Sequence, residues 1–367
     1  MKNVIVQLYP PGSYGDDAMV LSLFDQIDLG ESVLYVAEQK IHYPEKNYQF
    51  SQIFHPIKSR KLSSIVAFML TIKILWFSNL KKTSVYLIGA DVVDGYYGLY
   101  YPNVILKLIK YLSNCGFTVT LVGSSFSEDG NSYVARELSS LSSRKNVRIC
   151  IRDRNSLSRL MHIAPGKYNL VADVAALMLP AAGEDTKYIR HNGNLHIGLN
   201  VGLRDSMKGW STEQIAGELK LWCNLLQQKI TIVCIPHDTR GNYGGDLEPL
   251  LLIKKHLEGF PIDVIVPKIG GAKEAKFCVS MLDIVVTRRM HLAVAALSCG
   301  VKVIGIGYAN KFEGQFEHYA QKEFVVQDFG NVADLIINIC ECREFRIAQN
   351  FVENALALAR QNLVSKI

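Results

Sequence analysis

The sequence predicts an α/β protein built from two doubly wound domains that face each other across a cleft. Its 367 residues exceed what one hydrophobic core usually supports, so we expect two domains. Short apolar runs alternate with helical patterns almost from end to end, which is typical of parallel βαβ units. Apolar residues make up 49% and charged residues 20% of the chain, as expected of a folded protein.

The predicted elements follow this alternation through both halves. We expect strands near residues 3–8, 32–36, 84–88, 118–122, 147–151, 169–172, 195–199, 230–235, 262–266, 283–287, 301–306 and 323–326. We expect helices near 16–27, 103–114, 131–141, 154–161, 212–227, 247–257, 290–298, 331–342 and 345–362. The periodicity is lost over the polar stretch 180–187, which we interpret as the linker. The first domain would span 1–180 and the second 188–345, with a C-terminal helix in 346–367 packing back on the first domain.

Composition and motifs disfavour several classes of function. The net charge of +6 is not gathered into a basic stripe, and no nucleic-acid-binding signature is present, so we expect no nucleic-acid partner. The glycine spacings of dinucleotide loops and P-loops are missing, so we expect neither NAD nor ATP, no other cofactor and no metal. Eight cysteines without a CxxC pair indicate free thiols in a reducing compartment. Because a strand pattern starts at once, without a signal peptide, we expect a cytoplasmic protein.

One segment, Ile65–Phe77, is strongly apolar, but it contains Lys73 and is shorter than a membrane-spanning helix. Basic residues flank it on both sides: Lys58, Arg60, Lys61, Lys81 and Lys82. One interpretation is a helix that covers the core and has a solvated basic rim. The other is a peripheral contact of residues 60–82 with the inner, anionic face of a membrane, near a lipid-linked acceptor. On the sequence alone we favour the first.

A cluster of cations after two predicted strands gives the clearest indication of function. Arg289 and His291 lie at the turn from a buried strand into a helix, and the next strand is followed by Tyr308 and Lys311. If the two strands are parallel neighbours, the cations meet at a helix N-terminus. Unpaired N–H groups there favour an anion such as a phosphate or a phosphorylated carboxylate. The alternative is that Arg288 and Arg289 pair with carboxylates and that His291 is a core histidine.

Other polar clusters also follow predicted strands. The turn into the first helix contains Gly12, Ser13, Gly15 and Asp16, and its glycines allow a tight turn. Asp16 either complements the helix dipole or takes part in acceptor binding or proton transfer. The remaining clusters are Asp91 with Asp94, then Arg152 and Asp153 with Ser156 and Asp173, and finally Pro236, His237 and Asp238.

Taken together, these residues resemble the polysaccharide pyruvyl transferase family. The motifs are Gly12-x-x-Gly15-Asp16, Arg152-Asp153-x-x-Ser156 before Asp173, Ile235-Pro236-His237, and above all Arg289-x-His291 with Tyr308-x-x-Lys311. The resemblance implies a fold with two Rossmann-like domains, similar to that of the glycosyltransferase-B enzymes. It also implies transfer of a pyruvyl group from phosphoenolpyruvate to a sugar of a surface polysaccharide, such as a capsule or exopolysaccharide, or of its precursor. The product would be a pyruvate ketal, with release of phosphate.

The resemblance also implies roles for individual residues. Phosphoenolpyruvate would be bound by Arg289, His291, Lys311, Arg152 and Tyr308. The catalytic residues would be His291, Asp16, Asp94 and His237, and the acceptor would be bound by Gly12, Ser13, Gly15, Asp16, Asp91 and Asp94. Two positions depart from the family pattern. Ser13 stands where asparagine is usual, and Ala90-Asp91 replace the second glycine of a loop that more often reads Gly-Gly.

Two other functions fit the same pattern. A nucleotide-sugar-dependent glycosyltransferase would also place cations at a helix N-terminus, and Glu313 could contact a donor ribose. A non-catalytic carbohydrate-binding protein of a polysaccharide assembly is the third possibility. Uncompensated clustered cations argue against this last function, because they are costly to keep.

Overall fold

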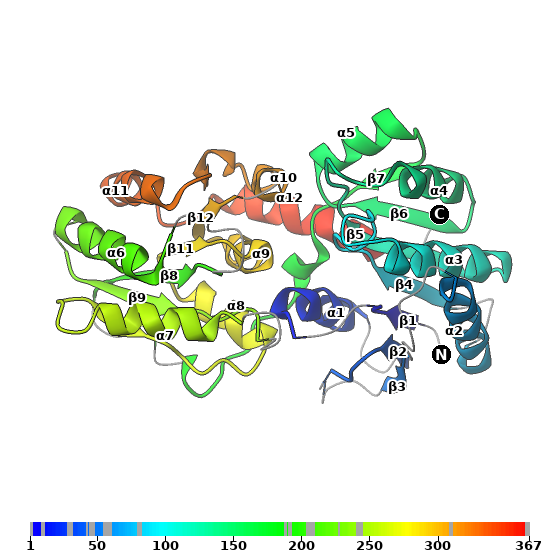
Figure 1. Cartoon of the computed structure of the whole chain (residues 1–367), viewed down its shortest axis with the longest axis horizontal. Helices are drawn as coiled ribbons and strands as arrows, with labels where there is room; N and C mark the ends of the chain where they lie inside the picture. Colours follow the sequence, from blue (N-terminus) through cyan, green and yellow to red (C-terminus); the bar gives the residue numbers. More distant parts are fainter. Residues whose placement is uncertain are drawn as a thin grey trace. The chain divides into compact units, whose positions relative to one another are not determined.

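The computed structural model describes residues 3–8, 12–27, 32–41, 43, 48–53, 61–78, 83–186, 189, 193–202, 210–226, 228–239, 245–307 and 311–363, except for the side chain of Lys311. The chain divides into two compact units. Unit 1 comprises Met1–Pro11, Met19–Leu177 and Ala357–Ile367, and unit 2 comprises Gly12–Ala18 and Met178–Leu356. Each unit is an α/β domain with its own parallel sheet (Figure 1). The prediction that the two domains face a common cleft stays a prediction.

Unit 1 contains a seven-stranded sheet in the order β3-β2-β1-β4-β5-β6-β7, with all neighbours parallel. The strands are β1 (Asn3–Val6), β2 (Val33–Ala37), β3 (Tyr48–Gln52), β4 (Ser84–Ile88), β5 (Thr118–Ser124), β6 (Val147–Ile151) and β7 (Tyr168–Leu170). The helices are α1 (Tyr14–Gln26), α2 (Ser63–Phe77), α3 (Tyr100–Asn114), α4 (Ser132–Ser142) and α5 (Arg154–Ile163). The central strands are buried along their length, which explains why their sequences are continuous apolar runs.

Unit 2 contains a six-stranded parallel sheet in the order β10-β9-β8-β11-β12-β13. The strands are β8 (Leu195–Asn200), β9 (Ile230–Cys234), β10 (Asp263–Ile265), β11 (Ile284–Thr287), β12 (Lys302–Ile306) and β13 (Val325–Val326). The helices are α6 (Thr212–Leu226), α7 (Leu247–His256), α8 (Ala272–Ser280), α9 (Met290–Ser298), α10 (Lys311–Glu317) and α11 (Val332–Cys342). Helix α12 (Gln349–Arg360) begins in unit 2 and ends in unit 1. Both sheets have the strand order of a Rossmann-like domain, in which the order reverses between the first and fourth strands.

Some elements differ from the prediction. The edge strand β3 is not predicted, because four of its five residues are partly or fully exposed and three of its side chains are polar. Helices α8 and α10 are too short to give a clear helical period. Helix α1 begins at Tyr14 instead of residue 16, and its first turn is grouped with unit 2.

The end of the chain belongs to unit 1. After α12, the side chain of Asn362 is fully buried. Its Oδ1 accepts a hydrogen bond from the N–H of Gly123 (3.1 Å), and its Nδ2 donates to the carbonyl of Ala172 (3.0 Å). A buried amide that satisfies backbone groups at two strand ends fixes the C-terminal segment on this sheet.

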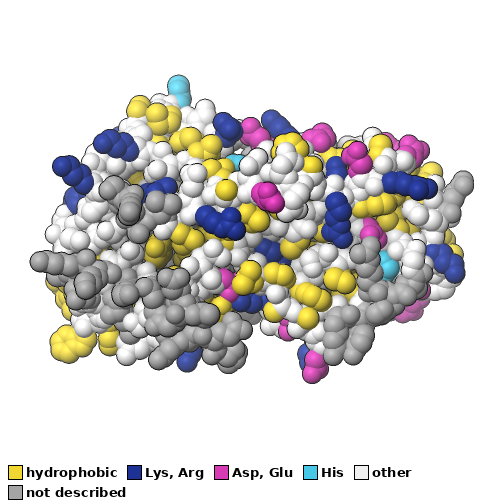
Figure 2. Space-filling view, turned by 180° about the vertical axis from the view of Figure 1, so that it is seen from behind, with side chains coloured by type: hydrophobic (Ala, Val, Ile, Leu, Met, Phe, Trp, Pro, Cys, Tyr) yellow, Lys and Arg dark blue, Asp and Glu magenta, His cyan; other side chains and the backbone are white. Residues whose placement is uncertain are grey.

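Charged side chains of both signs share the surface. Figure 2 shows Lys and Arg side chains interspersed with Asp and Glu among the described residues of the face that it presents. A basic stripe of the kind that binds nucleic acid is not visible among those residues.

Candidate functional site

The candidate site lies in unit 2, where the strand order reverses between β8 and β11. The two strands are parallel neighbours, with Thr287 in register with Asn200 at their C-terminal ends. Just beyond, the N–H of Arg288 donates to the carbonyl of Asn200 (3.1 Å), and the N–H of Arg289 donates to Oγ1 of Thr287 (2.9 Å). Arg289 is thereby placed as the N-cap residue of α9. Doubly wound sheets bind their ligands at this kind of switch point.

Two buried aspartates hold the guanidinium of Arg289. Its Nη2 and Nε donate to Oδ1 of Asp246 at 2.5 and 3.2 Å, and its Nη1 lies 3.5 Å from Oδ2 of Asp238. The Asp246 and Asp238 side chains are 1% and 4% exposed, whereas that of Arg289 is 25% exposed. The expectation of uncompensated cations is therefore wrong for Arg289. Buried charges persist when they are paired, and this cation is paired twice.

Asp246 organises the site and was not among the predicted site residues. It occupies the N-cap position of α7, yet its side chain makes no capping hydrogen bond to that helix. Instead, its Oδ2 accepts from the backbone N–H groups of His237 (3.0 Å) and Asp238 (2.9 Å) and from Nδ2 of Asn200 (2.9 Å). An aspartate just before a helix normally indicates an ordinary cap, so the local sequence contains no signal of this different role.

His237 is buried next to this carboxylate. The ring of Tyr14 contacts its imidazole edge-on, with 5.8 Å between ring centroids, and the N–H of Tyr14 donates to its carbonyl at 3.0 Å. The pKa of His237 is lowered to about 3, chiefly by burial and also by His291 and Arg289, against the opposing effects of Asp246 and Asp238. The imidazole is therefore neutral at pH 7, and its low basicity disfavours the expected catalytic role.

The glycine-rich turn before α1 is attached to the same loop. Ser13 forms an antiparallel bridge with Asp238. The carbonyl of Gly12 accepts hydrogen bonds from the N–H (3.0 Å) and the hydroxyl (3.1 Å) of Thr239. Gly12 has a φ of 109°, a value that favours glycine, so this residue type is required for the turn. The structure thus brings the predicted Gly12 and Ser13 to the His237–Asp238 loop.

Gly15 provides the space for His291. A Cβ atom at Gly15 would lie 2.5 Å from Cγ and 2.6 Å from Cβ of His291, closer than real Cβ atoms approach other heavy atoms. His291 is in the first turn of α9 and Asp16 is in the first turn of α1, and both are partly exposed. These three predicted site residues therefore lie in the same part of unit 2 as Arg289.

Two predicted donor-site residues cannot be placed. Tyr308 and the side chain of Lys311 lie outside the described residues. The backbone of Lys311 begins α10, which follows β12, and β12 pairs with β11. The parallel pairing of these two strands, which the prediction assumed, is therefore present.

The predicted residues of unit 1 have structural partners. Asp94 is 1% exposed, and its carboxylate accepts from the N–H of Tyr96 (2.9 Å) and from the N–H (3.1 Å) and hydroxyl (2.6 Å) of Ser127. This carboxylate joins the loops after β4 and β5, which explains its burial better than the expected catalytic role does. Asp91, in the same loop, is partly exposed.

Arg152 is buried at the end of β6. Its Nη1 donates to Asp173 at 2.8 Å, and its Nε donates to the hydroxyl of Ser125 at 2.6 Å. Burial alone would lower the pKa of the guanidinium, but the carboxylates of Asp173, Asp91 and Asp153 outweigh burial and raise it. A side chain that is 1% exposed and paired in this way is better explained as a structural ion pair than as the expected phosphoenolpyruvate ligand.

Within the described part of the chain, no group of three or more His, Cys, Asp or Glu side chains has the arrangement needed to hold a metal ion. The same residues contain no helix that is both long and apolar enough to span a membrane.

Solved structures with the same fold include UDP-GlcNAc 2-epimerases and a glycosyltransferase. The UDP-GlcNAc 2-epimerase of Neisseria meningitidis, solved with UDP-GlcNAc, is 14% identical with a TM-score of 0.60 and covers 99% of this chain and 100% of its own. The UDP-GlcNAc 2-epimerase of Methanocaldococcus jannaschii is 12% identical with a TM-score of 0.64 and covers 99% of this chain and 98% of its own. A glycosyltransferase of Rickettsia africae is 11% identical with a TM-score of 0.58 and covers 100% of this chain and 94% of its own. At these identities the likeness establishes the fold alone, and it confirms the predicted glycosyltransferase-B-like class.

The sequence itself identifies the family. A search of curated proteins gives no match. The family model described as "Polysaccharide pyruvyl transferase" matches residues 14–310, which include Gly15, His237, Arg289 and His291. This confirms the resemblance seen in the motifs. The chain belongs to the polysaccharide pyruvyl transferase family.

Proposed function

We propose that this protein transfers a pyruvyl group from phosphoenolpyruvate to a sugar of a surface polysaccharide or its precursor, forming a pyruvate ketal and releasing phosphate. Membership of the family indicates a transferase that acts on a sugar or polysaccharide. The observation that carries the proposal is the position of Arg289 and His291 at the switch point between β8 and β11, at the N-terminus of α9. A helix N-terminus with adjacent cationic side chains suits a phosphorylated carboxylate.

Arg289 is the proposed ligand of the phosphoenolpyruvate carboxylate or phosphate. Its guanidinium is fixed from one side by Asp246 and Asp238, while a quarter of the side chain remains exposed. A guanidinium that is already held in place loses little conformational entropy when it binds an anion. His291 is proposed to contact the phosphate or to supply its proton, with Lys311 as a second cation.

The proposed reaction needs an acid and a base but no metal. Protonation of the methylene carbon of phosphoenolpyruvate gives an oxocarbenium-like centre, which a sugar hydroxyl attacks as it loses its proton. Phosphate then leaves, and a second sugar hydroxyl closes the ketal with loss of its own proton. Asp16 is our preferred residue for the sugar hydroxyls, because it is partly exposed in the first turn of α1, whereas Asp94 and His237 are buried.

Calorimetry with phosphoenolpyruvate, UDP-sugars and GDP-sugars tests the proposal. We expect the wild type and His256→Ala to bind phosphoenolpyruvate and His291→Ala to lose this binding. His256 is a matched control, since it is another partly exposed histidine of unit 2, in the last turn of α7. Binding of a nucleotide sugar alone would make the protein a glycosyltransferase and overturn the proposal. If phosphoenolpyruvate binds, sugar acceptors, free and lipid-linked, are screened by phosphate release.

The acceptor and the location follow from the same proposal. We propose a cytoplasmic protein that works near the inner face of the membrane. A lipid-linked acceptor would then be presented at the membrane itself.

A further inference from the structure

Helix α2 of unit 1 places its largest apolar side chains on the outside. Its buried side includes Ser63 and Thr71 as well as aliphatic residues. Its outward side, which we name the α2 outer face, consists of Ile65 (55% exposed), Phe68 (57%), Met69 (59%), Ile72 (48%) and Trp76 (83%). The spacing of three to four residues puts these five side chains on one stripe of the helix. A helix on the surface of a water-soluble domain normally shows the opposite arrangement.

The exposed apolar area is large for a free surface. At about 200 Å² for each large side chain, the five exposed fractions amount to roughly 600 Å². Monomeric proteins rarely expose contiguous apolar patches above a few hundred Å², and larger patches mark interaction sites. The helix is otherwise firmly held, since it packs on α3, with the rings of Phe68 and Tyr111 in edge-on contact. Packing on α3 therefore accounts for the covered part of Phe68 but not for the exposed area of the outer face.

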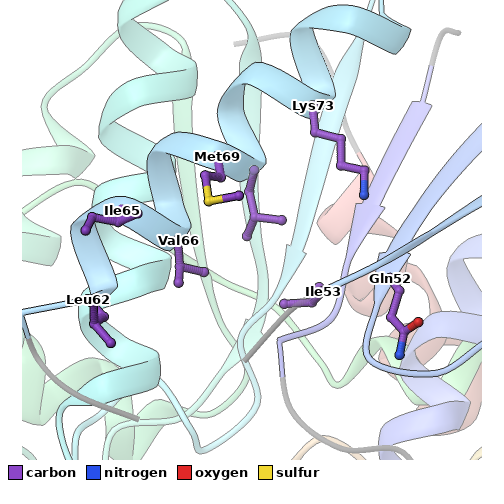
Figure 3. Close-up of a pocket in the computed structure, with 8 residues that line it drawn as sticks. Gln52, Ile53, Leu62, Ile65, Val66, Met69 and Lys73 are labelled. Atoms are coloured by element: carbon purple, nitrogen blue, oxygen red, sulfur yellow. The ribbon is translucent and has the colours of Figure 1, made fainter. Parts of the chain in front are cut away.

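A groove extends this face toward the sheet. It lies between α2 and the end of β3 and has a volume of about 150 Å³. In Figure 3, side chains of α2 stand on one side and Ile53 and Gln52 on the other. Two of the α2 residues, Ile65 and Met69, also belong to the outer face. The lining is Gln52, Ile53, Leu62, Ile65, Val66, Met69, Leu70 and Lys73.

The charge around α2 identifies the kind of partner. From Lys46 to Ala90 the sequence contains seven Lys or Arg residues and no Asp or Glu. The net charge of the whole chain is +6, so all other residues together carry −1. Among the described cations of this stretch, Lys61 is exposed just before α2 and Lys73 lies at the groove. An apolar stripe within a wholly basic stretch is complementary to an anionic lipid surface.

We propose that the α2 outer face docks the protein on an anionic membrane, with its apolar side chains at the boundary between headgroups and acyl chains. Lys61 and Lys73 would face the lipid phosphates. A second copy of this chain is a poorer partner, because the same stretch would bring like charges together. The inference does not depend on the reaction proposed above. The sequence alone favours a helix that covers the core and has a solvated basic rim. We now favour membrane contact instead, because α2 covers the core with one side only.

Vesicle co-sedimentation of the full chain tests the docking. We expect binding to vesicles of phosphatidylcholine mixed with phosphatidylglycerol, weaker binding to phosphatidylcholine alone, and a decrease with salt. The variant Met69→Ser/Trp76→Ser should bind at least about tenfold more weakly. Its side chains are mostly exposed, so its thermal unfolding should match the wild type. Leu221→Ser/Leu225→Ser on α6 removes two leucines of unit 2 that are 44% and 47% exposed, and it should bind like the wild type.

Tryptophan fluorescence gives a second readout. Trp76 is 83% exposed, so its emission should shift to shorter wavelength when anionic vesicles are added, and Trp76→Phe should abolish most of the shift while binding persists. Equal vesicle binding by the wild type and Met69→Ser/Trp76→Ser, or no binding to anionic vesicles, would overturn the proposal. A wild-type dimer that this double variant dissociates would also overturn it, since the face would then hold a second copy.

Discussion

Replacing Gly15 with alanine should displace His291 and impair the reaction while leaving the protein folded. The new Cβ would lie 2.5 Å from Cγ and 2.6 Å from Cβ of His291, whereas ordinary contacts begin near 3.4 Å. Because the His291 Cβ itself is too close, rotation of the imidazole cannot relieve the clash, and one of the two helices must shift by about 1 Å. A misplacement of this size costs roughly 10²-fold in rate, or about 2.7 kcal/mol of transition-state stabilisation.

Phosphate release from phosphoenolpyruvate with an identified acceptor, together with phosphoenolpyruvate calorimetry, measures this effect. Overpacking should also lower the free energy of unfolding by about 1–3 kcal/mol, which thermal denaturation detects. Gly217→Ala is the matched control, because it is the same change in helix α6 of unit 2 with nothing within 4 Å of the added Cβ. It should leave activity unchanged. A Gly15→Ala enzyme with wild-type binding and turnover would refute the assignment of His291 to the site.

Three further predictions concern the supports of the site. Asp246→Asn should weaken phosphoenolpyruvate binding and lower the free energy of unfolding by about 2–4 kcal/mol, since an amide cannot satisfy both Arg289 and the backbone donors. Calorimetry and thermal denaturation measure both effects, with the exposed Glu248→Gln as the control. Equal losses of binding and stability in the two variants would contradict the prediction. Ala90→Gly should raise the unfolding midpoint by about 1 °C or more, because Ala90 has a φ of +48°, and a lowered midpoint would oppose this reasoning. The pKa of His237 is lower in the folded than in the unfolded protein, so the unfolded state binds the proton first, and stability present above about pH 6.5 is lost as the pH falls toward 3. Between pH 7 and 5 the free energy of unfolding should fall by about 2 kcal/mol, and this fall should be smaller in His237→Gln. The same pH dependence in both proteins would contradict the lowered pKa of His237.

The fold could be predicted because the apolar pattern that indicates each strand is local in the sequence and recurs along the chain. Each central strand is buried along its length, so a continuous apolar run such as that of β11 indicates a strand between covering helices. The edge strand β3 lacks that signal, since only one of its five residues is buried. The first turn of α1 shows a different limit. This turn is continuous in sequence with a helix of unit 1. However, the two residues just before it, Gly12 and Ser13, pair with Thr239 and Asp238 of unit 2. Local sequence patterns contain no information about such long-range pairing.

Only those residues of the candidate site that directly follow a predicted strand could be predicted from the sequence. Arg289 and His291 follow a buried strand and begin a helix, so their position at a sheet edge can be inferred from sequence. Asp246 could not be found in this way, because an aspartate before a helix has the same appearance whether it caps that helix or binds elsewhere. Its carboxylate accepts from Asn200, the His237 loop and Arg289, so three separate segments become rigid around one buried anion. This explains how a partly exposed arginine can be held in place for the proposed anionic donor: the carboxylate of Asp246 that fixes Arg289 is buried, whereas a quarter of the arginine side chain is exposed.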